Sequence, residues 1–257
     1  MRNFSVFFGK EWMETIRSRK LFILAAVFAF FAILSTVMAR YMPEILGWAM
    51  ATGGDGFVIE MPDPTWIDAW MQFYSNLTQI GMFCILFIFM NIISGEKNSG
   101  SAALTLTKNL SHTTFVMAKF FMALLVFVLA LVASVLITYG YTHFFFGESG
   151  QIMHVLGGAL SFTVFVGFMI SIIIFSSTIS KGTAGSAAYS IIGYFVLILV
   201  GIISRIERFW PYTLVSRALN FTMGEPISDF IITFLITLAA TALLLILSIR
   251  ILKKQEI

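Results

Sequence analysis

Charged residues are scarce in this chain. Only 11% of its 257 residues are Asp, Glu, Lys or Arg, whereas 59% are hydrophobic. Soluble domains carry roughly a quarter charged residues, so a chain this poor in charge has too little polar surface to face water on all sides. The composition excludes an ordinary soluble domain and indicates an integral membrane protein.

Groups for redox or metal chemistry are also few. The single cysteine, Cys84, lies inside an apolar run and excludes a disulfide within the chain. The three histidines, His112, His143 and His154, do not stand beside a cysteine or an acid at metal-ligand spacing. We therefore expect no metal site and no catalytic residue.

A phosphate-binding loop is missing. Gly95 and Gly100 have the separation of that motif, but Ser101 and Ala102 stand where it requires Lys and then Ser or Thr. We expect this chain to bind no cofactor and to be no enzyme by itself. The net charge of +3 reflects bases that orient a membrane protein, and we expect no nucleic-acid partner.

What the chain has in abundance is long apolar runs. They lie near residues 21–39, 77–93, 120–139, 155–176, 183–203 and 230–249, and as bounded here none contains a charged residue. About 20 residues at 1.5 Å each cross a hydrocarbon core of about 30 Å. These runs predict an all-α membrane protein of six transmembrane helices, organised as a single domain over residues 1–257.

Lysine and arginine set the orientation. Six spans place both termini on one side, and most of the 16 Lys and Arg residues lie on that side. The positive-inside rule then predicts a multi-pass protein of the cell (cytoplasmic) membrane with both termini cytoplasmic.

Residues 1–20 form an amphipathic opening. Apolar residues recur at helical spacing at Phe8, Trp12 and Ile16, while another face carries Lys10, Glu14 and Arg17. We expect an interfacial helix in the lipid headgroup layer, with a plain charged flank of the first span as the alternative.

Two expected outer loops are rich in Trp, Pro and Gly. Residues 40–72 include Trp48, Trp66 and Trp70, and residues 204–229 include Trp210 and an apolar stretch through Leu219. This composition predicts short helices at the outer interface, or alternatively an aromatic belt that anchors the spans.

The conspicuous polar interval is 95–119, between the second and third spans. Gly95 ends the span, Glu96 favours the start of a helix, and small or apolar residues follow through Leu104 and Leu106. We expect a cytoplasmic coupling helix here, with a solvated loop as the alternative.

With six spans and an amphipathic first helix, this interval resembles the permease subunits of ABC transporters of the ABC-2 type. The family pattern is matched by Glu96, Gly100, Ser101, Leu104 and Lys119, with Ala103, Asn109 and His112 as departures. The opening Lys10 and Glu11 resemble the first helix of that family.

The resemblance implies a permease subunit of an ATP-driven exporter. Its partners would be a cytoplasmic ABC ATPase, which binds ATP and Mg, a second permease chain (identical or different) and membrane lipid. The residues implied in coupling to the ATPase are Lys10, Glu11, Gly95, Glu96, Gly100, Ser101, Leu104, Lys119 and, in a second contact, Lys181.

Walls rich in Phe and Met suit a hydrophobic drug, an antimicrobial peptide or a lipid as substrate. A regulatory or structural membrane protein that transports nothing remains an alternative with the same topology. An ion-coupled carrier is a further alternative, disfavoured because the runs as bounded lack the ionisable groups that such carriers use.

Overall fold

The computed structural model describes residues 2–52, 63–102, 110–203, 209–225 and 230–255. This part of the chain is all-helical, and it contains six helices long and apolar enough to cross a membrane. The expected all-helical fold and the number of candidate spans are confirmed. Residues 103–109 of the expected coupling helix lie outside the described residues.

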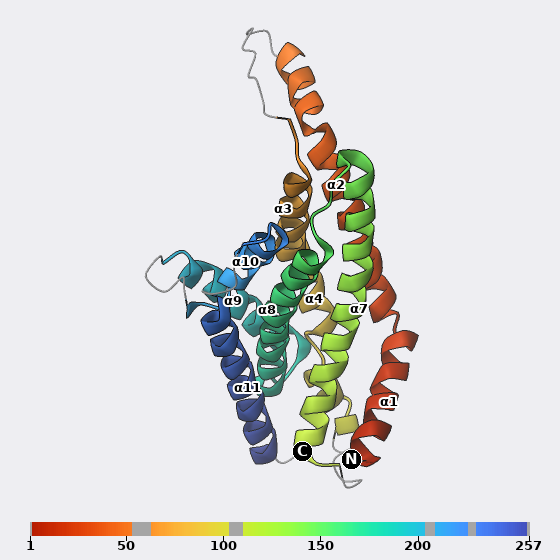
Figure 1. The fold of residues 1–257 in the computed structure, drawn as a ribbon. Coiled ribbons are helices and arrows are strands. Elements are labelled where there is room, and N and C mark those ends of the chain that lie inside the picture. Colours follow the sequence, from red (N-terminus) through yellow and green to blue (C-terminus); the bar gives the residue numbers. More distant parts are fainter. Residues whose placement is uncertain (1, 53–62, 103–109, 204–208, 226–229, 256–257) are drawn as a thin grey trace.

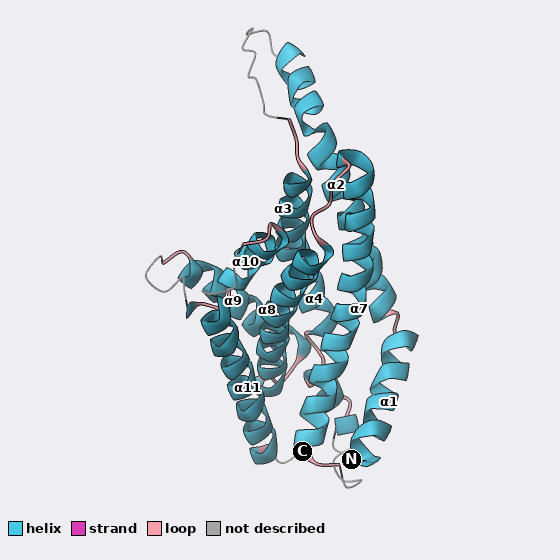
Figure 2. Cartoon of the chain, viewed as in Figure 1, coloured by secondary structure: helices cyan, strands magenta, loops and turns pink. Residues whose placement is uncertain are grey.

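The described residues form helices joined by turns and loops, as Figure 2 shows. Their bounds are α1 Arg2–Arg17, α2 Lys20–Thr52, α3 Trp66–Asn76, the π-helix η1 Leu77–Gly81, α4 Met82–Phe89, α5 Ser94–Asn98, α7 His112–Phe146, α8 Ile152–Ile179, α9 Thr183–Gly201, α10 Thr213–Thr222 and α11 Phe230–Lys254. The first turn of α1 and the last turn of α11 lie at the same end of the bundle, which we call the terminal end (Figure 1).

Helix α8 is the most buried of the six spans and packs against α7, α9, α10 and α11. Small residues let these helices approach closely, because backbones can then touch without a side chain between them. A Cβ on Gly158 would stand 2.4 Å from the Thr222 hydroxyl and 2.5 Å from the Ala218 carbonyl of α10. The face of α11 that is buried presents the small hydroxyls of Thr233, Thr237, Thr241 and Ser248.

The second span, Trp66–Asn98, is irregular: α3 continues through η1 into α4, and a turn separates α4 from α5. Irregular backbone in a membrane needs other partners for its polar groups. Helix α9 supplies them, because the Tyr194 hydroxyl donates to the Thr78 carbonyl and the Ser186 hydroxyl to the Met90 carbonyl.

The spans are longer than the apolar runs predicted. The second begins at Trp66 rather than Leu77, so Trp66 and Trp70 belong to it and not to a separate interfacial helix. Trp70 is fully buried, and its indole N–H donates to the Ser149 carbonyl at 3.1 Å. A short helix in the later outer loop was predicted and is present as α10.

Helix α1 packs against α7 and runs along the lower part of that helix (Figure 1). It buries Phe7, Glu11 and Thr15 against the bundle, whereas Ile16, on the apolar face expected to meet lipid, is exposed. The interfacial position of α1 stays a prediction. Arg19 takes a left-handed φ of 58° at the junction and turns the chain into α2.

Replacing Gly158 with Ala tests the close packing of α8 on α10. Overpacking of this kind costs typically 1–3 kcal/mol, so we expect Gly158→Ala to unfold at a lower temperature in detergent. Gly140→Ala is the matched control, because a Cβ there meets nothing within 4 Å and alanine favours a helix. Equal unfolding temperatures for the two variants would contradict this packing.

Candidate functional site

At the terminal end, charged residues from three separate parts of the sequence meet. Lys119 lies about two turns inside α7. Its ammonium donates to both carboxylate oxygens of Glu11 in α1 at 3.2 Å, and to Glu96 in α5 at 3.0 Å. Only 3% of the Lys119 side chain and 8% of the Glu11 side chain is exposed. The ammonium therefore joins three helices away from water.

A second lysine approaches the same carboxylates from the surface. The Lys10 ammonium lies 3.3 Å from Glu96 Oε1 and 3.6 Å from both Glu11 Oε1 and Glu14 Oε2. Partial burial lowers the pKa of Lys10, but the charges of Glu96, Glu11 and Glu14 outweigh that effect and leave the pKa above its ordinary value. We call Lys10, Glu11, Glu96 and Lys119 the charge cluster.

Aromatic rings line the cluster. The Phe7 and Phe115 rings pack with centroids 5.6 Å apart. The Lys119 ammonium lies 5.0 Å from the Phe115 centroid, and that of Lys10 lies 5.2 Å from the Phe7 centroid. Each ring faces a cation and excludes water from the ion pairs, which strengthens the attraction between the charges.

A cavity of about 430 Å³ adjoins the charge cluster. Its lining includes Lys20, Asn91 and Ser99 in addition to the cluster. Glu96 Oε2 is buried and has no hydrogen-bond partner among the described residues. One carboxylate oxygen of Glu96 thus holds the two lysines while the other is unpaired.

The carboxylates of Glu11, Glu14 and Glu96 place oxygens within 4.8 Å of one another, a spacing that a metal ion could bridge. However, Lys10 and Lys119 already lie against these oxygens and neutralise them. A cation would have to displace an ammonium that is already paired, so the arrangement fits an ion-pair network better than a metal centre.

The other side of α5 is fastened by Lys97. Its ammonium donates to the carbonyls of Thr178 at 2.9 Å and Ser180 at 3.2 Å, and to the side chain of Gln255 at 2.7 Å. The Ser177 hydroxyl oxygen accepts from the amides of Ile93 at 3.0 Å and Ser94 at 2.8 Å. Helix α5 is therefore tied to the end of α8 and to the chain just after α11.

Of the residues that sequence analysis linked to coupling, Lys10, Glu11, Glu96 and Lys119 contact one another. Gly95 and Ser101 line the same cavity as the charge cluster. Gly100 takes a φ of 71° after α5, Lys181 is exposed between α8 and α9, and Leu104 lies outside the described residues. Sequence analysis missed Lys97, Ser177 and Gln255, because their partners are largely backbone groups.

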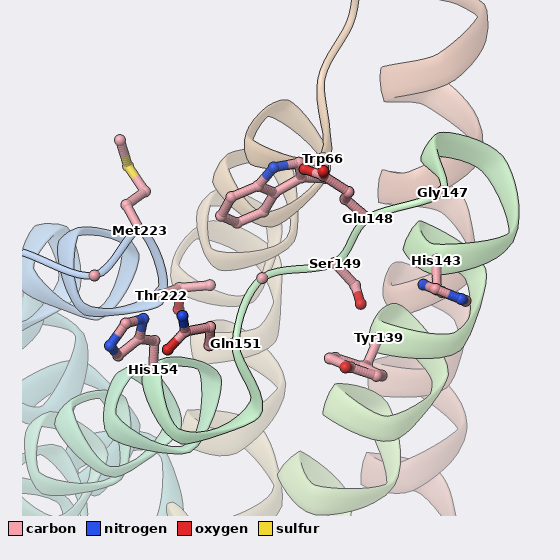
Figure 3. A pocket seen from close by; sticks show the side chains of 12 residues that line it. Trp66, Tyr139, His143, Gly147, Glu148, Ser149, Gln151, His154, Thr222 and Met223 are labelled. Atoms are coloured by element: carbon pink, nitrogen blue, oxygen red, sulfur yellow. The ribbon is translucent and has the colours of Figure 1, made fainter.

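A second cavity, of about 560 Å³, lies at the opposite end of the bundle. Figure 3 shows the connection through Gly147, Ser149 and Gln151 passing between His143 of α7 and His154 of α8. The Trp66 ring packs against Gly150, and the His154 ring packs against Gly224. Within the described residues, the imidazoles of His143 and His154 belong to no group of metal-ligating side chains. We therefore assign no metal-binding role to this cavity.

Replacing Lys119 with Met tests the cluster. The change leaves two largely buried carboxylates without their main cation, and breaking a buried ion pair in this way costs about 3–5 kcal/mol. We therefore expect a clear fall in the unfolding temperature in detergent. Lys10→Met is the control, because the Lys10 side chain is 46% exposed, and an exposed pair contributes about 1 kcal/mol or less.

The triple variant Lys119→Met, Glu11→Gln, Glu96→Gln should recover part of the loss, because it leaves no unpaired charge. If Lys119→Met were no less stable than Lys10→Met, the ion pairs of Lys119 would not be what holds α1, α5 and α7 together.

No known family model matches this chain. It is 24% identical over 185 residues to the uncharacterized transmembrane protein YxlG of Bacillus subtilis (strain 168), a match that covers 71% of this chain and 70% of that protein. The name of the relative agrees with the six apolar helices. The chain is a multi-pass membrane protein.

Proposed function

We propose that this chain is the transmembrane permease subunit of an ATP-driven exporter of the ABC-2 type. One observation carries the proposal. Lys10, Glu11, Glu96 and Lys119, which the resemblance to that family singled out in distant parts of the sequence, contact one another at one end of the bundle. A chance likeness of short motifs gives no reason for these residues to meet.

The energetics of the cluster also favour a role beyond stability. Buried ion pairs are often no more stabilising than apolar side chains of similar size, and they hold defined geometry instead. This network fixes Glu96, and with it α5, at the start of the segment that continues to residue 110. Such a fixed starting point suits a coupling helix that must transmit force.

The power source would be a separate protein. The chain lacks a phosphate loop, so ATP and Mg would bind to a partner ATPase beneath the terminal end. That end would be cytoplasmic by the positive-inside rule.

A substrate path is supported by polar groups on the second span. Gln79 is exposed near the middle of Trp66–Asn98 and donates to the Ser75 hydroxyl at 2.9 Å. Gln79 and Ser75 also line a cavity of about 360 Å³ between α3, η1 and α10, together with Tyr74 and Tyr212. An amide at this depth would be costly if it faced lipid, so this face suits a path or a second permease chain. A hydrophobic drug, an antimicrobial peptide or a lipid would fit such walls.

The ion-coupled carrier needs revisiting, because the longer spans do contain charges. Each of these charges lies toward an end of its span: Lys20, Arg40 and Glu44 in the first, Asp68, Glu96 and Lys97 in the second, Lys119 in the third, and Arg250, Lys253 and Lys254 in the last. Lys119 is paired near the terminal end, and Asp68 accepts from the Thr65 amide and hydroxyl as part of a helix cap. None of them lies at the middle of a span, where a carrier of that kind would use an ionisable group.

Co-purification tests the proposal. The tagged chain, extracted in mild detergent from its native membrane, should recover an ATPase with a phosphate loop, and the complex should hydrolyse ATP in a vanadate-sensitive way. Recovery of neither such a partner nor ATP hydrolysis would favour a membrane protein that transports nothing.

A point variant refines the same experiment. Leu104→Glu places a charge in the apolar part of the expected coupling segment and should reduce recovery of the ATPase. Leu104 is not a member of the charge cluster, so the variant should unfold at the same temperature as the parent chain. Glu148→Gln, at the opposite end of the bundle, is the control and should recover the ATPase as the parent does.

A further inference from the structure

Lys97 has an unusual set of partners for a lysine at a helix end. Within the described residues, no carboxylate lies within ion-pair distance of its ammonium, which contacts the Thr178 and Ser180 carbonyls and the Gln255 side chain. The last carbonyls of a helix carry a partial negative charge and attract a cation. Lys97 of the second span therefore caps the end of α8.

Ser177 makes the reciprocal contact. Its hydroxyl oxygen accepts from the Ile93 and Ser94 amides at the start of α5, and its proton is directed to the Ser94 hydroxyl at 3.2 Å. The first amides of a helix have no partner within that helix, so a hydroxyl placed there stabilises its start. Each of the two elements thus supplies the missing partners of the other.

The connection between α8 and α9, residues 180–182, belongs to the same assembly. The Ser180 hydroxyl bonds to both the amide and the carbonyl of Gly182, which closes a tight turn. The Asn98 amide of α5 lies 3.8 Å from where a Cβ on Gly182 would stand. Helix α5 and this connection are therefore in direct contact, with exposed Lys181 between the two bonded residues.

We propose that Lys97 is a positioning residue that joins α5 to residues 180–182, so that both predicted ATPase contacts move as one body. The inference rests on the proposed function, because it concerns how the docking surface of that function is held together. Glu96 and Lys97 are adjacent but point to opposite sides: Glu96 to α1 and α7, Lys97 to α8 and the end of α11. Force applied to α5 or to residues 180–182 would reach α1 and α7 through Glu96, and α8 and the end of α11 through Lys97.

Spin-label distances test the proposal. In a Cys84→Ser background, cysteines at Ser99 and Ala184 label the exposed end of α5 and the exposed first turn of α9. With no further substitution, the two labels should give a single narrow distribution of distances. That distribution should be the same in the nucleotide-free and the vanadate-trapped complex with the ATPase. In the Lys97→Met variant, the distribution of distances between the two labels should broaden and should differ between the nucleotide-free and the vanadate-trapped complex.

Three further variants sharpen the result. Lys97→Arg keeps a cation with several donors and should restore the narrow distance, and Ser177→Ala should broaden it by removing the cap on α5. Lys253→Met is the control: Lys253 is exposed in the last turn of α11 and belongs to neither predicted ATPase contact, so the distance should not change.

The outcomes separate the two proposals. A Lys97→Met distance that is as narrow and as independent of nucleotide as that of the parent would overturn the positioning role, as would an equal effect of Lys253→Met. If the parent chain recovers no ATPase but Lys97→Met still loses the narrow distance in the isolated chain, the proposed function fails while the joining role of Lys97 stands.

Discussion

The terminal end of the bundle depends on the ammonium of Lys119, held between the carboxylates of Glu11 and Glu96. This one group connects α1, α5 and α7, and it gives the Glu11 carboxylate a partner on the buried side of α1. The rings of Phe7 and Phe115 keep water from the pairs. Burying a charge without a partner is costly, so Lys119 must be paired here. This requirement determines which side of α1 faces α7 and where α5 lies.

The same logic of paired groups extends through the second span. Its irregular backbone frees carbonyl groups that lipid cannot satisfy, and hydroxyls of α9 satisfy them at Thr78 and Met90. At the end of the span, Lys97 and Ser177 exchange bonds between α5 and α8. The second span is thus held by α8 and α9, and α5 is the point at which these contacts and the charge cluster meet.

The six spans could be predicted from the sequence because a segment that crosses lipid must be a long run of apolar residues, and such runs are visible in the sequence. Sequence analysis also selected four members of the cluster, but as contacts to another protein, because a sequence does not show that charges 23 or 108 positions apart will meet. It did not foresee that Glu11 lies on the buried side of α1, because the partner of its carboxylate, Lys119, is far away in the sequence. Lys97 counted only as a positive charge, because backbone carbonyls leave no trace in a pattern of side chains.

A charge network that holds the start of a polar segment at one end of an apolar bundle supports the permease role proposed above. The most direct test is a cryo-electron microscopy map of the chain purified with its partners from its native membrane. The account predicts an ATPase that contacts α5 and residues 180–182 at the terminal end, with Lys119 still paired to Glu11 and Glu96. A map in which that end is bare, or is covered by a protein without a nucleotide site, would contradict it.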